Sequence, residues 1–123
     1  MRLSALGDVV HALPMLDALR RGRPDAEIGW LVEEGAASLL EDHPQLDRLW
    51  IAPRQTARRL RREGKRAEAV ALVVRRLREL RAASYELVID AQCNLRSTFW
   101  SRGSGAPHRI GFAPPFTQEK AHW

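Results

Sequence analysis

The 123-residue sequence predicts an α/β fold in which a parallel sheet is covered by helices. Two observations favour it. Short apolar runs alternate with helical stretches along the chain, and the apolar runs are continuous rather than alternating with polar residues, as in strands buried on both faces. The length suits one domain with its own core, and 45% hydrophobic with 28% charged residues is typical of a globular protein.

The expected strands are short, bounded by turn residues, and lie at 28–32, 46–51, 87–89 and 108–112. Pro53 is expected to end the second strand. Pro114 and Pro115 are expected to end the fourth strand. The continuous run 87–89 is expected to be buried on both faces.

Helical spacing of apolar residues predicts the remaining elements. The first helix covers 9–19, and Pro14 inside it should kink the helix or separate its first turn. A short helix is expected at 36–40 and another at 95–100. Residues 54–64 contain one large apolar residue, Leu60, and so form a loop or an exposed helix. From 66 to about 84 an amphipathic helix should bury one face, made by Val70, Val73, Val74, Leu77 and Leu80.

The positive charge is concentrated in one block. The net charge is +5, but the stretch from Arg54 to Arg81 holds 11 basic and 3 acidic residues, so the rest of the chain is mildly acidic. Such a block attracts phosphates, nucleic acid or an anionic membrane surface, and the alternative is a solvated helix face. The aromatic residues do not alternate with the basic ones as stacking platforms would, so we expect no nucleic acid.

Several classes of protein are excluded. No apolar run of 18 residues and no secretory signal is visible, which favours a cytoplasmic protein. The single cysteine, Cys93, rules out a disulfide framework and a multi-cysteine zinc site, and we expect neither metal nor cofactor. Neither a G-x-G-x-x-G motif nor a P-loop occurs.

Ligands of open parallel sheets bind beyond the carboxyl ends of the strands, where segments 4–8, 33–35 and 90–94 are expected. In the first segment Gly7 would permit a tight turn. Asp8 then begins a helix, where it either caps the helix or accepts a proton from a substrate hydroxyl. His11 lies one turn later and shares its face.

Residues 2–14, RLSALGDVVHALP, resemble the N-terminal signature of the lipopolysaccharide heptosyltransferases, glycosyltransferase family 9. Further similar segments follow in the same order at 30–35, 85–92, 96–97 and 109–112. Gln118–Trp123 resembles a family segment that often begins with arginine, whereas this sequence has an uncharged glutamine at that position. Cys93 stands where many members have glycine, and we assign it no chemistry.

The resemblance implies a GT-B enzyme made of two Rossmann-like domains, each a parallel sheet with helices on both faces. Residues 1–123 would be the N-terminal domain, which binds the lipid A–Kdo or inner-core acceptor. The donor, ADP-heptose, would bind mainly to a C-terminal domain. Transfer inverts the anomeric centre, and the family's general base corresponds to Asp8.

The acceptor-binding residues that we expect lie in the three segments and the basic block: Ser4, Gly7, His11, Arg54, Arg58, Arg59, Arg61, Arg62, Asp90, Gln92 and Arg96. For Asp90, capping of the next helix is an equal alternative. The later arginines, from Arg75 to Arg81, are attributed mostly to a solvated face. The acceptor and the inner face of the inner membrane are both anionic, so we expect peripheral contact with that membrane.

The sequence departs from the family in two respects. Family members begin with an apolar strand of several residues, of which only Met1–Leu3 remain here. The loss of this strand should leave backbone groups of the neighbouring strands unpaired. No donor domain follows Trp123, so we expect this chain to be inactive alone. The competing hypothesis is a non-catalytic module that binds anions, on a membrane or nucleic acid, through Arg54–Arg66.

Overall fold

Strand pairing is parallel throughout the part of the protein that the computed structural model describes, residues 1–112. The predicted α/β class is therefore confirmed. The chain divides into two units, one formed by Arg2–Ala52 and the other by Met1 together with the chain from Pro53 onward. Each unit contains one pair of strands and its own helices. The predicted stop at Pro114 and Pro115 and the segment Gln118–Trp123 lie outside the described residues.

In the Arg2–Ala52 unit, strand β1 (Gly29–Glu33) pairs with β2 (Arg48–Ala52) along their whole length. Both strands begin and end within two residues of the predicted limits. The buried core beside them is made of residues from β1, the helices and the turns: Val9, Leu16, Trp30, Val32, Ala36, Ala37 and Leu40. Trp30 and Val32 of β1 belong to this core, and Leu31, on the opposite face of the strand, is also buried, as the continuous apolar run predicted.

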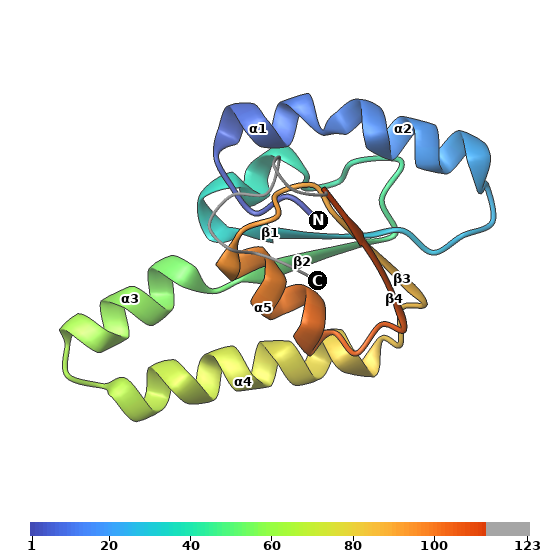
Figure 1. Cartoon of the computed structure of the whole chain (residues 1–123). Helices are drawn as coiled ribbons and strands as arrows, with labels where there is room; N and C mark the ends of the chain where they lie inside the picture. The colour runs from blue at the N-terminus through green and yellow to red at the C-terminus, as the bar shows by residue number, and fades with distance from the viewer. Residues whose placement is uncertain (113–123) are drawn as a thin grey trace. The chain divides into compact units, whose positions relative to one another are not determined.

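The predicted first helix is two helices, α1 (Leu6–His11) and α2 (Leu13–Gly22), which follow one another in Figure 1. Pro14 lies in the first turn of α2, where its missing N–H has no partner to lose. The predicted separation at this proline is therefore confirmed. The short helix expected at 36–40 is a 3₁₀ helix, η1 (Glu34–Leu39), which begins directly after β1. The predicted loop 33–35 is thus the end of β1 and the start of η1.

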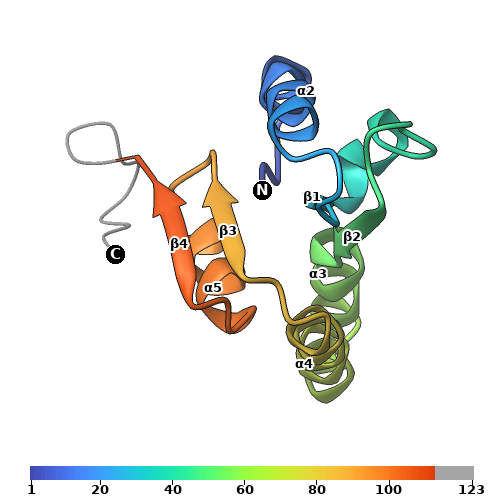
Figure 2. The ribbon, with the colours of Figure 1, turned by 90° about the vertical axis from the view of Figure 1, so that its right-hand side faces the viewer.

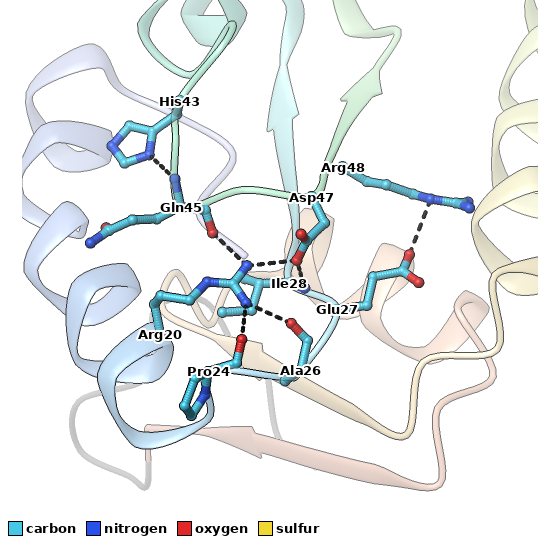
Figure 3. A network of polar contacts seen from close by, with 9 residues as sticks. All are labelled: Arg20, Pro24, Ala26, Glu27, Ile28, His43, Gln45, Asp47 and Arg48. Atoms are coloured by element: carbon cyan, nitrogen blue, oxygen red, sulfur yellow. Dashed lines mark hydrogen bonds and ion pairs between the residues drawn. The ribbon is translucent and has the colours of Figure 1, made fainter.

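Arg20 joins the end of α2 to the amino ends of both strands (Figure 3). Its guanidinium donates to the carbonyl oxygens of Pro24, Ala26 and Gln45 at 2.8–3.0 Å and to Oδ2 of Asp47 at 2.6 Å. The same Oδ2 accepts the backbone N–H of Ile28 at 2.7 Å. Nothing in the sequence pattern predicted this network, because its acceptors are backbone carbonyls of turns.

In the other unit, β3 (Leu87–Asp90) pairs with β4 (His108–Gly111), and helix α5 (Leu95–Gly103) packs against β3 (Figure 2). All three elements lie where the sequence predicted them. The burial of β3 on both faces is wrong, however. Leu87 is 43% exposed and Val88 and Ile89 are half-buried.

Helices α3 (Arg54–Arg62) and α4 (Arg66–Ala82) form a hairpin, seen at the lower left of Figure 1. Of the two predicted alternatives for residues 54–64, the exposed helix is confirmed. The turn follows the Schellman pattern. The Lys65 N–H donates to Leu60 O, the Gly64 N–H donates to Arg61 O, and Gly64 has φ +79°, a conformation that favours glycine.

The predicted apolar face of α4 is wrong in part. Val70 is 56% exposed and Val74 is 37% exposed, whereas Ala69 and Leu80 are buried. The buried stripe is therefore rotated along the helix, from Ala69 through Val73 to Leu80. The periodicity predicted the helix correctly. Because Val and Ala occur on several sides of α4, the periodicity did not determine which side is buried.

Residues 1–3 form no strand, yet they make backbone hydrogen bonds of the kind that join parallel strands, one of them from the Met1 amino group to Ile89 O. The N–H of Glu33, at the end of β1, donates to Leu3 O, and the N–H of Ala91, after β3, donates to Met1 O. The expectation that neighbouring backbone groups stay unpaired is therefore wrong at these positions.

Candidate functional site

The segment from Ser4 to Asp8 leaves the carboxyl end of β1, because Leu3 is hydrogen-bonded to the last residue of that strand. Helix α1 begins at Leu6, and Asp8 is its third residue. Oδ2 of Asp8 accepts the backbone N–H of Ala5 at 3.3 Å. The interpretation of Asp8 as the N-cap is wrong, since Ala5 holds that position, but the carboxylate still satisfies a free N–H at the helix start.

Arg2 forms an ion pair with Asp8, with 2.6 Å between Nη2 and Oδ2. The hydrogen bond from Arg2 lowers the pKa of Asp8 most, followed by the hydrogen bond from Ala5 and the charge of Arg2, with a smaller effect of His11. The Asp8 side chain is 48% exposed. The site therefore presents a carboxylate that is ionised at neutral pH and open to solvent.

The other predicted residues of this segment are exposed or half-buried beside Asp8. Gly7 lies inside α1 with helical geometry, so the expected tight turn is wrong. A Cβ built on Gly7 would meet no atom within 4 Å, which means that the space above it is open. His11 is exposed at the end of α1, three residues after Asp8, and its charge slightly lowers the pKa of Asp8. Ser4 is half-buried and has an interaction partner.

A second set of predicted residues follows β3 in the other unit. Asp90 is 1% exposed, and its Oδ1 accepts the N–H groups of Gln92 and Cys93 at 2.9 and 3.0 Å. It therefore shapes the loop before α5, but it is not the cap of that helix. The cap is Asn94, which exchanges hydrogen bonds with Ser97 in a capping box. Gln92 is buried, and Arg96 is exposed on α5.

Cys93 has φ +49°, a conformation in which glycine is favoured over other residues. This gives a physical reason for the glycine that many members of the resembled family have here. The thiol is fully buried, accepts the N–H of Phe112 at 3.0 Å and donates to Asp90 O at 3.0 Å. These contacts join the ends of β3 and β4 and indicate a structural role.

Helix α3 exposes all five of its predicted acceptor-binding arginines: Arg54, Arg58, Arg59, Arg61 and Arg62. Arg59 lies 3.9 Å from Glu63, and Arg54 also has an interaction partner. Arg58, Arg61 and Arg62 form no ion pair with any residue in 1–112. Three uncompensated guanidinium groups on one helix provide a surface that attracts anions.

The structure thus brings Ser4, Gly7, Asp8 and His11 together in one unit and places the remaining candidates in the other. Among residues 1–112 no group of three or more His, Cys, Asp or Glu side chains could hold a metal ion. The described helices include none long and apolar enough to cross a membrane. Arg2 was missed as a site residue, although it belongs to the quoted signature, because its six-residue distance from Asp8 matches no local spacing rule.

Comparison with known proteins gives the family. No family model matches the chain. Among curated proteins it is 36% identical over 107 residues to lipopolysaccharide heptosyltransferase 1 of Pseudomonas aeruginosa, and 30% identical over 102 residues to the Campylobacter coli protein of that name. The chain belongs to the lipopolysaccharide heptosyltransferase family. The matches cover 85% and 83% of this chain, but 29% and 27% of the relatives, so the chain spans less than a third of their length.

Solved structures agree with this family. The Escherichia coli heptosyltransferase WaaC with ADP superposes with a TM-score of 0.77 at 29% identity, covering 97% of this chain and 38% of that one. A glycosyl transferase of family 9 from Veillonella parvula gives a TM-score of 0.71 at 23% identity, with 95% and 33% covered, and supports the fold alone. These structural neighbours confirm the predicted GT-B type of fold.

Proposed function

We propose that residues 1–123 form the acceptor-binding domain of an inverting heptosyltransferase of lipopolysaccharide core synthesis, in which Asp8 is the general base. The observation that carries the proposal is the Asp8 carboxylate, which is ionised, 48% exposed and located at the carboxyl edge of β1. Ligands of parallel sheets bind at this edge. The sequence relatives are named for heptose transfer to lipopolysaccharide.

In the proposed reaction, a hydroxyl oxygen of the acceptor attacks the anomeric carbon of ADP-heptose. The bond from that carbon to the diphosphate oxygen breaks, ADP leaves with the bonding electrons, and the hydroxyl proton passes to Asp8. A sugar hydroxyl is a poor nucleophile, so removal of its proton during attack lowers the barrier. Two neighbouring WaaC structures contain ADP or a fluoro analogue of ADP-heptose, which supports this donor.

The lowered pKa of Asp8 has two consequences for this role. The carboxylate needs no deprotonation before it acts at neutral pH. It is also a weak base, so it takes the proton only as the attack develops and the hydroxyl becomes acidic. This timing fits a displacement without a covalent intermediate.

The exposed arginines of α3 are proposed to attract the acceptor, whose lipid A phosphates and Kdo carboxylates are anionic. The same side chains would hold the protein at the inner face of the inner membrane, where each basic residue near the surface adds about 1 kcal/mol. ADP-heptose would bind mainly to residues that this chain does not contain, because the relatives are about three times as long. We therefore propose that the chain alone transfers no heptose.

Replacing Asp8 tests the proposal. In a full-length heptosyltransferase that carries this sequence, Asp8→Asn is expected to lower kcat by about 10²- to 10⁴-fold, the usual contribution of a general base. The KM for the acceptor should change little. Asp17→Asn is the matched control, because Asp17 is also a helical aspartate with a half-exposed side chain paired with an arginine, Arg21; its Oδ1 accepts the Gln45 side-chain amide as well. Near-normal kcat in Asp8→Asn would refute the general base.

The exposed arginines also support the alternative, a non-catalytic module that binds anions. That function predicts binding that weakens steeply with salt and is unaffected by Asp8→Asn. Acceptor binding is measured by titrating micelles of Kdo-bearing lipid A at two ionic strengths. Heptose transfer from ADP-heptose by the unaided chain would contradict the proposed inactivity of the isolated segment.

A further inference from the structure

We propose that Arg2 is the positioning residue of the general base: it fixes one carboxylate oxygen of Asp8 and leaves the other free to receive the acceptor's proton. The inference rests on the proposed role of Asp8. It names a residue outside the sequence-predicted site, and it depends on how Arg2 itself is held.

Arg2 extends from a segment that is fastened to β1. Its carbonyl oxygen accepts the indole N–H of Trp30 at 3.2 Å, and Trp30 is only 3% exposed. The next residue, Leu3, is fully buried and its carbonyl oxygen accepts the N–H of Glu33 at 2.9 Å. The Arg2 side chain is 17% exposed. The backbone of Arg2 is therefore fixed on the unit, and its side chain is mostly buried on the way to Asp8.

The two contacts of the Asp8 carboxylate fall on the same atom. Oδ2 accepts hydrogen bonds from Nη2 of Arg2, 2.6 Å away, and from the backbone N–H of Ala5, with 3.3 Å between nitrogen and oxygen. Within residues 1–112 no hydrogen bond to Oδ1 is formed. Fixing Oδ2 from two directions determines the side-chain torsions, so the direction in which Oδ1 points is also determined. A base must meet its proton within about 3 Å, so a fixed direction favours the reaction.

A purely stabilising role explains the arrangement less well. Ion pairs with a solvent-exposed member contribute little to stability, and Asp8 is half exposed. A mostly buried guanidinium that points at a solvent-facing carboxylate instead limits the conformations of that carboxylate. The hydrogen bond from Arg2 also lowers the pKa of Asp8, so Arg2 favours the carboxylate form.

Other charged groups lie on the elements around Asp8. His11 follows on α1 and lowers the pKa of Asp8 further. Among the elements that pack against α1, η1 carries Glu34, and α2 carries Asp17, Arg20 and Arg21. A test must therefore separate the effect of Arg2 from that of a general change in charge.

The experiment is an NMR titration of the Asp8 carboxyl carbon in the 123-residue chain, with the Hα–Hβ couplings of Asp8 as the measure of its rotamer. The variants are Arg2→Met, which removes the charge at similar length, and Arg2→Lys, which keeps it. Arg21→Met is the matched control, because it removes an arginine paired with another aspartate in the same unit. The indole N–H signal of Trp30 reports an intact fold, since its acceptor is backbone.

In the wild type we expect one Asp8 rotamer and a titration midpoint below 3.8, the ordinary aspartate value. Arg2→Met should average the couplings and raise the midpoint, Arg2→Lys should restore both in large part, and Arg21→Met should leave both unchanged. A folded Arg2→Met protein with the wild-type rotamer and midpoint would overturn the inference. So would equal shifts in Arg2→Met and Arg21→Met.

If Arg2→Met does not fold, the wild type decides. The guanidinium signals of Arg2 must then titrate with the midpoint of Asp8, and signals that do not follow Asp8 overturn the inference. These readouts need no turnover. A normal kcat in Asp8→Asn would refute Asp8 as the base, even if its rotamer and titration midpoint depend on Arg2. If Asp8→Asn abolishes turnover but the rotamer and midpoint do not depend on Arg2, only the role of Arg2 is refuted.

Discussion

Replacing Arg20 should destabilise the Arg2–Ala52 unit far more than the same change at the neighbouring Arg21. Both arginines lie in the last turn of α2. The Arg20 side chain is 22% exposed and donates four hydrogen bonds, three of them to backbone carbonyls. Arg21 is 74% exposed and pairs with Asp17 on its own helix. The substitutions Arg20→Met and Arg21→Met each remove one positive charge. Arg20→Met also removes the hydrogen bonds between α2 and the turns before the strands, whereas Arg21→Met removes only an ion pair within α2.

The magnitude follows from which acceptors lose a partner. The carbonyls of Pro24 and Ala26 and the Asp47 carboxylate are exposed enough for water to replace Arg20, whereas the Gln45 carbonyl is part-buried. A charge-assisted bond contributes about 1.5–3 kcal/mol when shielded and much less when exposed, so we expect Arg20→Met to lower the free energy of unfolding by about 2 kcal/mol. An exposed i,i+4 pair contributes about 0.3–0.5 kcal/mol, which sets the expectation for Arg21→Met.

Urea and thermal denaturation of the two variants measure this difference. For a chain of this size about 2 kcal/mol corresponds to a drop in Tm of roughly 8 °C, against about 1–2 °C for the control. Raising the salt concentration should reduce the Arg20 effect only in part, because bonds to neutral carbonyls persist. Equal destabilisation by the two substitutions would refute the assignment of Arg20 as the link between α2 and the strands.

Three further predictions concern single substitutions. Hydrogen bonds from Ile28 and Arg20 lower the pKa of Asp47, so its contribution to stability is present above 3.8 and is lost as the pH falls through the lower, folded pKa. Urea denaturation of Asp47→Asn should therefore show a deficit at pH 7 that disappears in strong acid, and a deficit that persists there contradicts the linkage. Gly7→Ala should raise stability by about 0.5–1 kcal/mol, because alanine favours helix and its methyl group meets no atom; acceptor binding should weaken if the acceptor occupies that space, and unchanged binding would place it elsewhere. Asn94→Ala should cost about 1 kcal/mol by removing the cap of α5, measured by thermal denaturation, and a cost near zero would mean that the capping box does not stabilise the helix.

Element types were predictable because they depend on local chemistry. Pro14 separated two helices, and the apolar runs marked the strands wherever turn residues bounded them. Packing sides were less predictable, as α4 shows: Val70 and Val74 are as apolar as Val73, so only the tertiary contacts decide which of them is buried. The same limit applies to Leu87 of β3.

The candidate site was predicted in part. The position of Asp8 at a strand's carboxyl end followed from the sequence, but its contacts did not. The pairing with Arg2 depends on the path of residues 3–7, and the network of Arg20 depends on carbonyls that carry no side-chain signal. The burial of Asp90 and Gln92 was not predictable from the sequence either. A polar residue after a strand can face a ligand, or it can form hydrogen bonds with the backbone of its own loop.

The buried thiol of Cys93 provides a built-in measure of motion at the edge where Asp90 ends β3. It is the single cysteine of the sequence and is fully enclosed, with Phe112 N–H on its sulfur. A thiol reagent can reach it only when this edge opens transiently, so the labelling rate reports how often that happens. Comparing that rate with and without acceptor would show whether a ligand tightens or loosens the framework beneath it.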